Sequence, residues 1–163
     1  MFDEIDPSKL FDKKKFATLI VTPEGIKKNQ TVTDALIGIT DAKTSLVERE
    51  EFLKILKDSD SRPLLIQEIE VEKDPEKKAK LLSVFWEIGL EATDRFLFFV
   101  QQACTDNFIV SLEAFTVIET IENEIPKEEL IKAEQLVSET IKQEPESKAL
   151  LEELLVFIQE RIN

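Results

Sequence analysis

The chain has 163 residues, of which 42% are hydrophobic and 34% are charged, a balance typical of a folded helical protein rather than a disordered one. Its 34 acidic and 21 basic residues give a net charge of −13, which disfavours nucleic acids and anionic membrane surfaces as partners. Only three glycines occur, too few for the tight turns of a many-stranded sheet, so the composition favours an all-α fold.

The first forty residues are expected to form a helical cap on the rest of the chain. A helix start is indicated at residues 6–8, and the short apolar run at 16–21 is read as helix because no partner strand is evident. Residues 25–31 are expected to form a loop or a short helical turn. No linker rich in Gly, Ser or Pro follows, so residues 1–163 are predicted to form a single all-helical domain.

From residue 31 onward, apolar spacing and capping residues predict a series of helices. Asp41 and Asp74 are expected to cap the starts of two of them, and Gly89 is expected to end one. The predicted helices cover about 31–39, 41–58, 63–72, 74–88, 96–104, 107–123, 126–141 and 147–161.

Residues 106–121 repeat the pattern of residues 73–88, which lie 33 positions earlier. The matching positions are Val110/Lys77, Ala114/Leu81, Val117/Val84, Ile118/Phe85 and Ile121/Ile88. Apart from Lys77, these residues are predicted to form the buried faces of two helices. A period of this length is typical of stacked helical hairpins.

The repeated residues resemble HEAT or armadillo-like repeats. In that family, the second helix of a hairpin follows a turn containing Asp and then carries Val, a basic residue, Ala and further apolar residues at set positions. Asp106 and the apolar residues after it fit this pattern, but Ser111 stands where a basic residue is usual. Residues 96–100 look like the first helix of the same hairpin.

Flanking copies of the repeat are weaker. In the preceding copy Lys78 takes the basic position, while Lys73 replaces the turn Asp. A following copy is offset by 37 and is filled by Ser147, Leu151, Leu154, Leu155 and Ile158, and a faint earlier one ends at Phe52 and Ile55. The resemblance covers about 41–163 and implies a right-handed α-α superhelix of antiparallel hairpins; an irregular helical bundle is the alternative.

Few residues in the chain are suited to catalysis. Histidine and tyrosine are absent, which excludes Ser-His-Asp and Cys-His arrangements and imidazole metal ligands, and no glycine-rich phosphate-binding motif occurs. Carboxylate pairs such as Glu68/Glu72 and Glu119/Glu122 are better explained as solvated helix faces than as a carboxylate-based active site. We expect no enzyme, no catalytic, cofactor-binding or metal site, and no cofactor.

Cys104 stands alone near the end of an apolar helix, without a basic neighbour, and is predicted to be a buried structural cysteine. A single cysteine cannot form an intramolecular disulfide, which favours a reducing interior. Neither a signal peptide nor an apolar run long enough to span a membrane occurs, so a cytoplasmic location is expected.

Two groups of apolar residues bear on possible interfaces. An aromatic cluster is predicted to pack between hairpins, and Leu97 or Phe98 is expected to face a second surface; its members are Phe85, Trp86, Phe96, Phe98, Phe99, Phe108 and Phe115. The last helix carries more apolar residues than one stripe holds, so a homodimer through this C-terminal helix is expected; they are Leu150, Leu151, Leu154, Leu155, Val156, Phe157, Ile158 and Ile162.

These features favour a non-enzymatic protein–protein interaction module or scaffold that binds a protein or peptide on a helix-lined acidic surface. The alternative is a small acidic inhibitor or immunity-type protein that neutralises a basic partner. It is motivated by residues 107–163, where 13 acidic and five basic residues leave a local charge of −8. The sequence by itself singles out no partner-binding residue.

Overall fold

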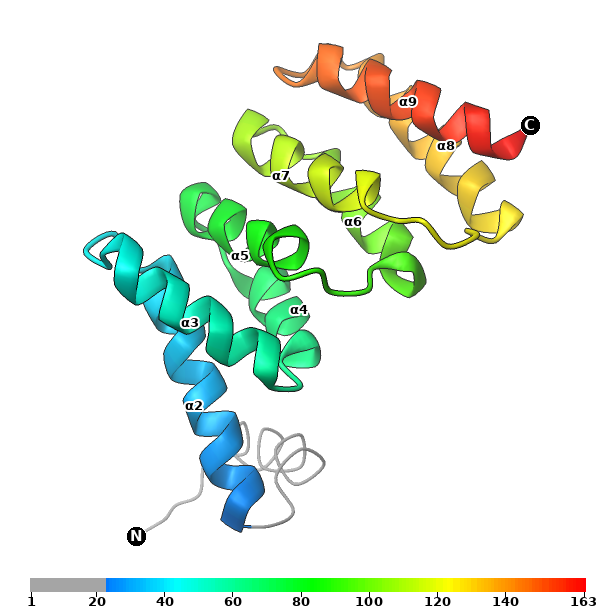
Figure 1. Ribbon diagram of the computed structural model, residues 1–163. Coiled ribbons are helices and arrows are strands. Elements are labelled where there is room, and N and C mark those ends of the chain that lie inside the picture. Colours follow the sequence, from blue (N-terminus) through cyan, green and yellow to red (C-terminus); the bar gives the residue numbers. More distant parts are fainter. Residues whose placement is uncertain (1–22) are drawn as a thin grey trace, which may run out of the picture.

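The structure, a computed structural model, describes residues 23–163, with their side chains from residue 31 onward. Within this range the chain forms eight α-helices and one short 3-10 helix and contains no strand, which confirms the predicted all-α class (Figure 1). The predictions for residues 1–22 lie outside the described residues. In chain order the elements are α2 (Pro23–Thr40), α3 (Leu46–Asp58), α4 (Arg62–Val71), α5 (Pro75–Glu87), η1 (Thr93–Arg95), α6 (Phe96–Ala103), α7 (Phe108–Glu119), α8 (Lys127–Ile141) and α9 (Lys148–Ile162).

The first described helix is longer than the sequence predicted. Residues 25–31 were expected to form a loop or a short helical turn; the loop is wrong, and the helical turn is part of a longer helix, because α2 runs without a break from Pro23 to Thr40. Proline suits the first turn of a helix, where its missing N–H leaves no hydrogen bond unmade. The four residues expected on its apolar face are all buried; they are Val32, Ala35, Leu36 and Ile39.

The start of α3 also differs from the prediction. Ser45, not Asp41, is the N-cap, and it forms a reciprocal capping box with Glu48: the Glu48 N–H donates to the Ser45 hydroxyl at 3.1 Å, and the Ser45 N–H donates to the Glu48 carboxylate at 3.0 Å. Asp41 instead accepts a hydrogen bond from the Lys43 N–H in the preceding turn. The capping box gives hydrogen-bond acceptors to two backbone N–H groups at once, those of Ser45 and Glu48, which favours the later helix start.

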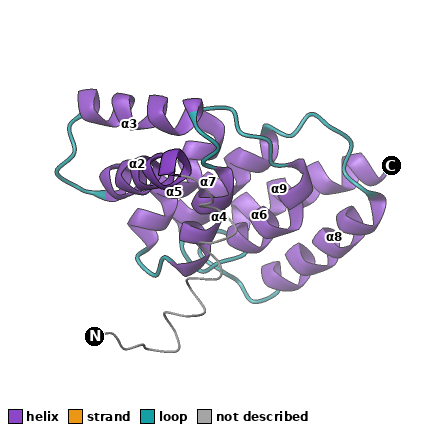
Figure 2. Cartoon of the chain, turned by 90° about the horizontal axis from the view of Figure 1, so that it is seen from below, coloured by secondary structure: helices purple, strands orange, loops and turns teal. Residues whose placement is uncertain are grey.

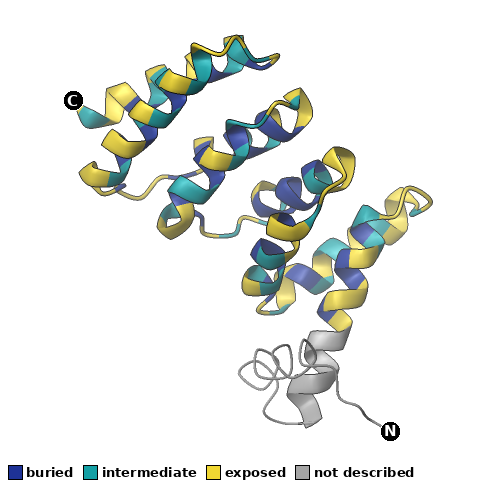
Figure 3. Ribbon diagram, turned by 180° about the vertical axis from the view of Figure 1, so that it is seen from behind, coloured by how far each residue is buried: buried dark blue, intermediate teal, exposed yellow. Residues whose placement is uncertain are grey.

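Neighbouring helices pack as antiparallel pairs that follow one another along the chain. The pairs are α2/α3, α4/α5, α6/α7 and α8/α9, and contacts also join α2 to α5, α5 to α7, α6 to α8 and α7 to α9. In Figures 1 and 2, α5, α7 and α9 form one row in chain order, with α4, α6 and α8 in a second row. The buried residues face inward between the helices, which leaves the outer faces of both rows exposed (Figure 3).

The repeat seen in the sequence corresponds to helices α5 and α7. Their N-caps, Asp74 and Asn107, are 33 residues apart, and each side chain accepts a hydrogen bond from a first-turn N–H at 3.0 Å. Most of the matched apolar positions are buried as predicted: Leu81, Val84 and Phe85 of α5 and Ala114, Val117 and Ile118 of α7. In the last predicted pair Ile121 is buried, but Ile88 is only partly buried. Lys77 is exposed, in line with its exclusion from the predicted buried face.

Helix α5 ends at the predicted glycine. Gly89 has φ of +71°, a conformation that costs other residues energy, and the Leu90 N–H donates to the Phe85 carbonyl at 2.9 Å. This bond is the hallmark of a Schellman C-cap. Helix α7, in contrast, ends at Glu119, four residues before the predicted position 123.

Ser111 forms a buried polar junction between the α6/α7 and α8/α9 pairs. Its hydroxyl is fully buried, donates to the Ala103 carbonyl at 2.6 Å at the end of α6, and lies 3.2 Å from the hydroxyl of Ser147, the buried N-cap of α9. The departure from the basic residue of the HEAT pattern therefore has a physical reason. A lysine or arginine at this position would place an unpaired charge in the core.

Candidate interaction surface

Cys104 and the carboxylate pairs Glu68/Glu72 and Glu119/Glu122 all lie in the described part of the chain. Among the described side chains, no group of three or more Cys, Asp or Glu residues is placed to hold a metal ion. Glu68, Glu119 and Glu122 are exposed on the surface. Cys104 is partly buried, and this burial raises the pKa of its thiol, with a smaller opposing effect of a hydrogen bond with Thr140. A raised pKa lowers the fraction of reactive thiolate.

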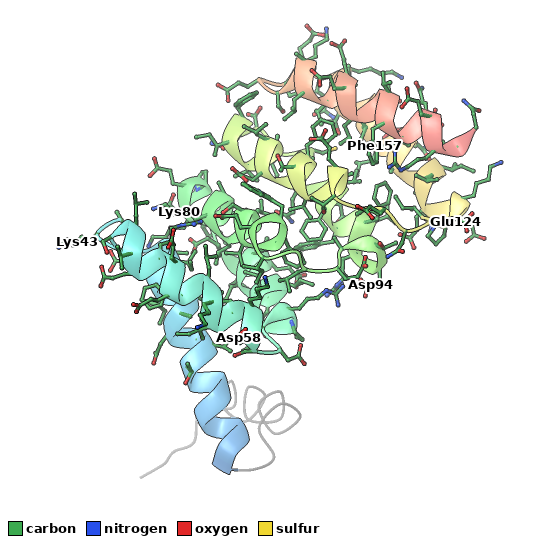
Figure 4. All side chains as sticks on the ribbon, in the orientation of Figure 1. Lys43, Asp58, Lys80, Asp94, Glu124 and Phe157 are labelled. Carbon is green, nitrogen blue, oxygen red and sulfur yellow. The ribbon has the colours of Figure 1, made fainter. Side chains whose placement is uncertain are left out.

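Most of the predicted aromatic cluster does form core. Phe85, Phe96 and Phe99 are fully buried, and the Phe85 and Phe99 rings meet edge to face with centroids 4.8 Å apart. Phe115 is buried as well and packs edge-on against Phe157 of α9 (Figure 4). Aromatic contacts between successive helix pairs thus stabilise the stack.

Two members of that cluster are not core residues. Trp86 and Phe108 retain 40% and 43% of their surface exposed, so their predicted place in the core is wrong. Leu97 or Phe98 was expected to face a second surface; both are partly buried against the core, and Phe98 packs edge-on against Phe99. The exposed aromatic surface therefore lies on α5 and α7 rather than on α6.

The apolar excess of the last helix is largely taken up inside the molecule. Leu151, Leu154 and Ile158 are buried, and Leu150, Leu155, Phe157 and Ile162 pack partly buried against the core. Val156 is the one large apolar residue of α9 that is exposed. Helix α9 packs against both α8 and α7, which explains why it needs more than one apolar stripe. The homodimer remains a prediction, with less apolar surface to support it.

Four of the exposed apolar side chains lie on α5 and α7, two helices in contact. Trp86 belongs to α5, and Phe108, Ile109 and Leu112 belong to α7, with exposures of 43%, 50% and 39% for these three. Residues three and four apart share a helix face, which groups Ile109, Leu112 and Glu113. We call Trp86, Phe108, Ile109, Leu112 and Glu113 the α5–α7 patch.

A hydrogen bond fixes the tryptophan in this patch. The Trp86 indole N–H donates to Glu113 Oε1 at 2.7 Å, which joins α5 to α7 across the surface. The indole is therefore held in one orientation while a large part of its ring stays exposed. An exposed aromatic side chain that is already ordered loses little conformational entropy when a partner covers it.

A cation near Glu113, Arg49 of α3, is already paired. It makes a two-point ion pair with Glu87 at 2.6 and 2.7 Å and lies 3.4 Å from the Ser83 hydroxyl. The hydrogen bond with Glu87 raises the pKa of Arg49, and the charge of Glu113 adds to this effect. Burial alone would raise the pKa of Glu87, but the bonds from Arg49 and Ser83 outweigh it and hold that pKa below its usual value.

The α6/α7 pair, which carries four of the five patch residues, is acidic. Between Arg95 and Lys127 the chain contains no Lys or Arg, so the whole α6/α7 pair lacks a positive side chain. The same stretch carries five carboxylates: Asp106, Glu113, Glu119, Glu122 and Glu124. A cationic partner would be attracted to this region and an anionic one repelled.

The loops at one edge of the molecule form a second, more polar surface. The Asn123 amide donates to the Glu91 carboxylate at 2.8 Å, and the Arg62 guanidinium donates to the Glu91 carbonyl at 2.7 Å and pairs with Asp94. Asp94 and Glu124 lie on this edge (Figure 4). It has two grooves: one of about 470 Å³ is lined by Glu122 and Glu124 together with Lys127 and Arg161, and one of about 220 Å³ is lined by Glu91 and Glu122 without a cation. These polar groups hold the loops together, so the edge is a weaker candidate than the α5–α7 patch.

One signal in the sequence could have revealed the patch. Helix α7 is apolar on nearly all sides, from Phe108 through Ile118, and such a helix cannot bury every side chain against a single neighbour. Residues 96–100 and the last helix show a similar apolar surplus in the sequence, and only these two were predicted to face a second surface. Which of the three surpluses would stay exposed depends on the neighbouring helices.

No family model matches the chain, and neither a curated protein nor a solved structure matches it. Within residues 23–163, no helix is both long enough and apolar enough to cross a membrane.

Proposed function

We propose that this chain is a non-enzymatic protein-binding module or scaffold, in which HEAT/armadillo-like hairpins form a right-handed superhelix. It binds a protein or peptide partner on a helix-lined acidic surface. The observation that carries the proposal is the succession of helix pairs in chain order, each in contact with the next. Arrays of this kind provide an extended surface for partners. The absence of histidine and tyrosine from the chain adds support.

The proposal is tested by isolating a partner. The tagged full chain is crosslinked in its own cells, purified, and the recovered proteins are compared with those bound to the tag alone. We expect a protein that co-elutes with the chain at fixed stoichiometry after both are purified and mixed. If no protein exceeds the tag control, and none forms such a complex, the proposed function is wrong.

The charge of residues 107–163 favours one second candidate, an acidic inhibitor that neutralises a basic enzyme. Such a complex associates faster at low ionic strength, because opposite charges steer the encounter. An inhibitor would abolish the partner's activity at equimolar concentration, whereas a scaffold would leave it unchanged. Association kinetics that do not change with salt would count against the inhibitor.

A further inference from the structure

The α5–α7 patch differs from the scattered apolar residues that most protein surfaces carry. Ten large apolar residues are exposed in the described part of the chain, and four of them, Trp86, Phe108, Ile109 and Leu112, lie on α5 and α7, two helices in contact. Single exposed apolar residues need no explanation, but a group of them marks an interaction site.

The patch contains a suitable anchor for a partner. Tryptophan is among the residues most enriched at the energetic centres of protein interfaces. The bond from Trp86 to Glu113 positions the ring and uses only Oε1 of the carboxylate. A carboxylate accepts several hydrogen bonds, so Glu113 retains capacity for a guanidinium or ammonium group.

The surrounding charges define the partner's chemistry. The α6/α7 pair, which supplies four of the five patch residues, contains no Lys or Arg, and the Arg49 guanidinium is paired with Glu87. A second copy of the chain would bring the same acidic face and a net charge of −13, so like charges would oppose patch-to-patch pairing. A cationic segment that also carries apolar side chains would complement both the apolar residues and the carboxylate of the patch.

We propose that the α5–α7 patch binds a cationic amphipathic segment of a partner protein. Its apolar side chains cover Trp86, Ile109 and Leu112, and a lysine or arginine pairs with Glu113. The inference rests on the proposed function and specifies the binding face and the partner's chemistry. The expected mode is that of an amphipathic helix lying along an apolar surface.

The chain offers matched controls for a mutational test. Ile109 and Ile131 are the same residue type with nearly the same exposure, 50% and 49%, but Ile131 lies on α8, outside the patch. Glu113 of the patch is likewise matched by the exposed Glu139 of α8. The variants I109Q and I131Q, and E113Q and E139Q, therefore compare equal chemical changes on two faces.

Random peptides displayed on phage are selected on the immobilised full chain, and the enriched peptides are synthesised and titrated against each variant by fluorescence anisotropy. We expect enrichment of peptides that combine Lys or Arg with Leu, Ile, Phe or Trp. Loss of a buried isoleucine contact corresponds to about tenfold weaker binding or more for I109Q, with I131Q close to wild type. E113Q is expected to weaken binding and reduce its salt dependence, and E139Q to do neither.

Failure of the patch proposal can be distinguished from failure of the proposed protein-binding function. Enriched peptides that bind I109Q and I131Q equally, or that lack basic residues, would overturn the inference while leaving a protein-binding module in place. A peptide of residues 9–22, which also joins lysines to apolar residues, is included as a probe. If it binds the patch more tightly than the selected peptides, the occupant is this chain's own N-terminal segment and the inference is wrong. No enrichment would also overturn it, and a failed partner isolation would then remove the proposed function as well.

Discussion

Replacing Ser111 by alanine is expected to weaken the junction between the last two helix pairs. The side chain is fully buried, its hydroxyl donates to the Ala103 carbonyl at 2.6 Å, and it lies 3.2 Å from the hydroxyl of Ser147. The substitution removes a hydrogen bond with a net value of about 1 kcal/mol and leaves a buried carbonyl unsatisfied, which costs about 1–3 kcal/mol. We therefore expect the free energy of unfolding to fall by about 2 kcal/mol.

The assay is urea unfolding followed by far-ultraviolet circular dichroism, with stability taken from the midpoint and slope. Thr116 on the same helix provides the control, because its hydroxyl also bonds a backbone carbonyl, that of Leu112 at 2.8 Å, but at an exposed site. Thr116→Ala should change stability by no more than about 0.5 kcal/mol. If Ser111→Ala is as mild as Thr116→Ala, the buried junction does not contribute as we describe.

Three further predictions concern other parts of the fold. In a double-mutant cycle with Arg49→Met and Glu87→Gln, a coupling of about 1 kcal/mol is expected near neutral pH. Because folding lowers the pKa of Glu87, the coupling energy between Arg49 and Glu87 is present above pH 4.5, the ordinary pKa of a glutamate, and declines as the pH falls through the lower folded-state pKa. Urea titrations that show equal coupling in acid would contradict this. Gly38→Ala should lower the melting temperature measured by calorimetry, despite alanine's better helix propensity, because the new Cβ would lie 2.2 Å from the Phe52 ring. Adding Phe52→Leu should partly restore the melting temperature. A higher melting temperature for Gly38→Ala alone would refute this packing. Because burial raises the pKa of Cys104, alkylation by iodoacetamide should be several-fold slower in the native protein than in urea, and equal rates would show that the thiol is not shielded.

Local pattern was sufficient to predict the repeat and the buried faces that define it. The register of α5 and α7 follows from apolar residues recurring with the helical period, and Gly89 ends α5 through a conformation that only glycine adopts readily. The caps of α3 were harder, because Asp41 and Ser45 can both accept first-turn hydrogen bonds. The second bond of the capping box, in which the Ser45 N–H donates to the Glu48 carboxylate, favours Ser45 as the N-cap. This bond forms only when the first turn of the helix is formed.

Exposure could not be predicted to the same extent, because it depends on which helices cover which faces. Trp86 and Phe108 read as core residues by composition alone, yet no neighbouring helix covers them fully. The last helix shows the opposite outcome, since contacts with two helices take up an apolar surplus that suggested a dimer. The candidate surface was thus predicted only as an acidic, helix-lined face, and its location required the packing of α5 against α7.

Trp86 gives the most direct test of the proposed binding face, because it belongs to that face and is the single tryptophan in a chain without tyrosine. Its emission and its quenching by acrylamide can be followed while the chain is titrated with a selected tryptophan-free cationic peptide or with the isolated partner. We predict a blue shift and protection from acrylamide on saturation. The I109Q variant should require about tenfold more ligand than wild type, and I131Q should require the same concentration as wild type. Saturable binding that leaves the emission and quenching of Trp86 unchanged would contradict it.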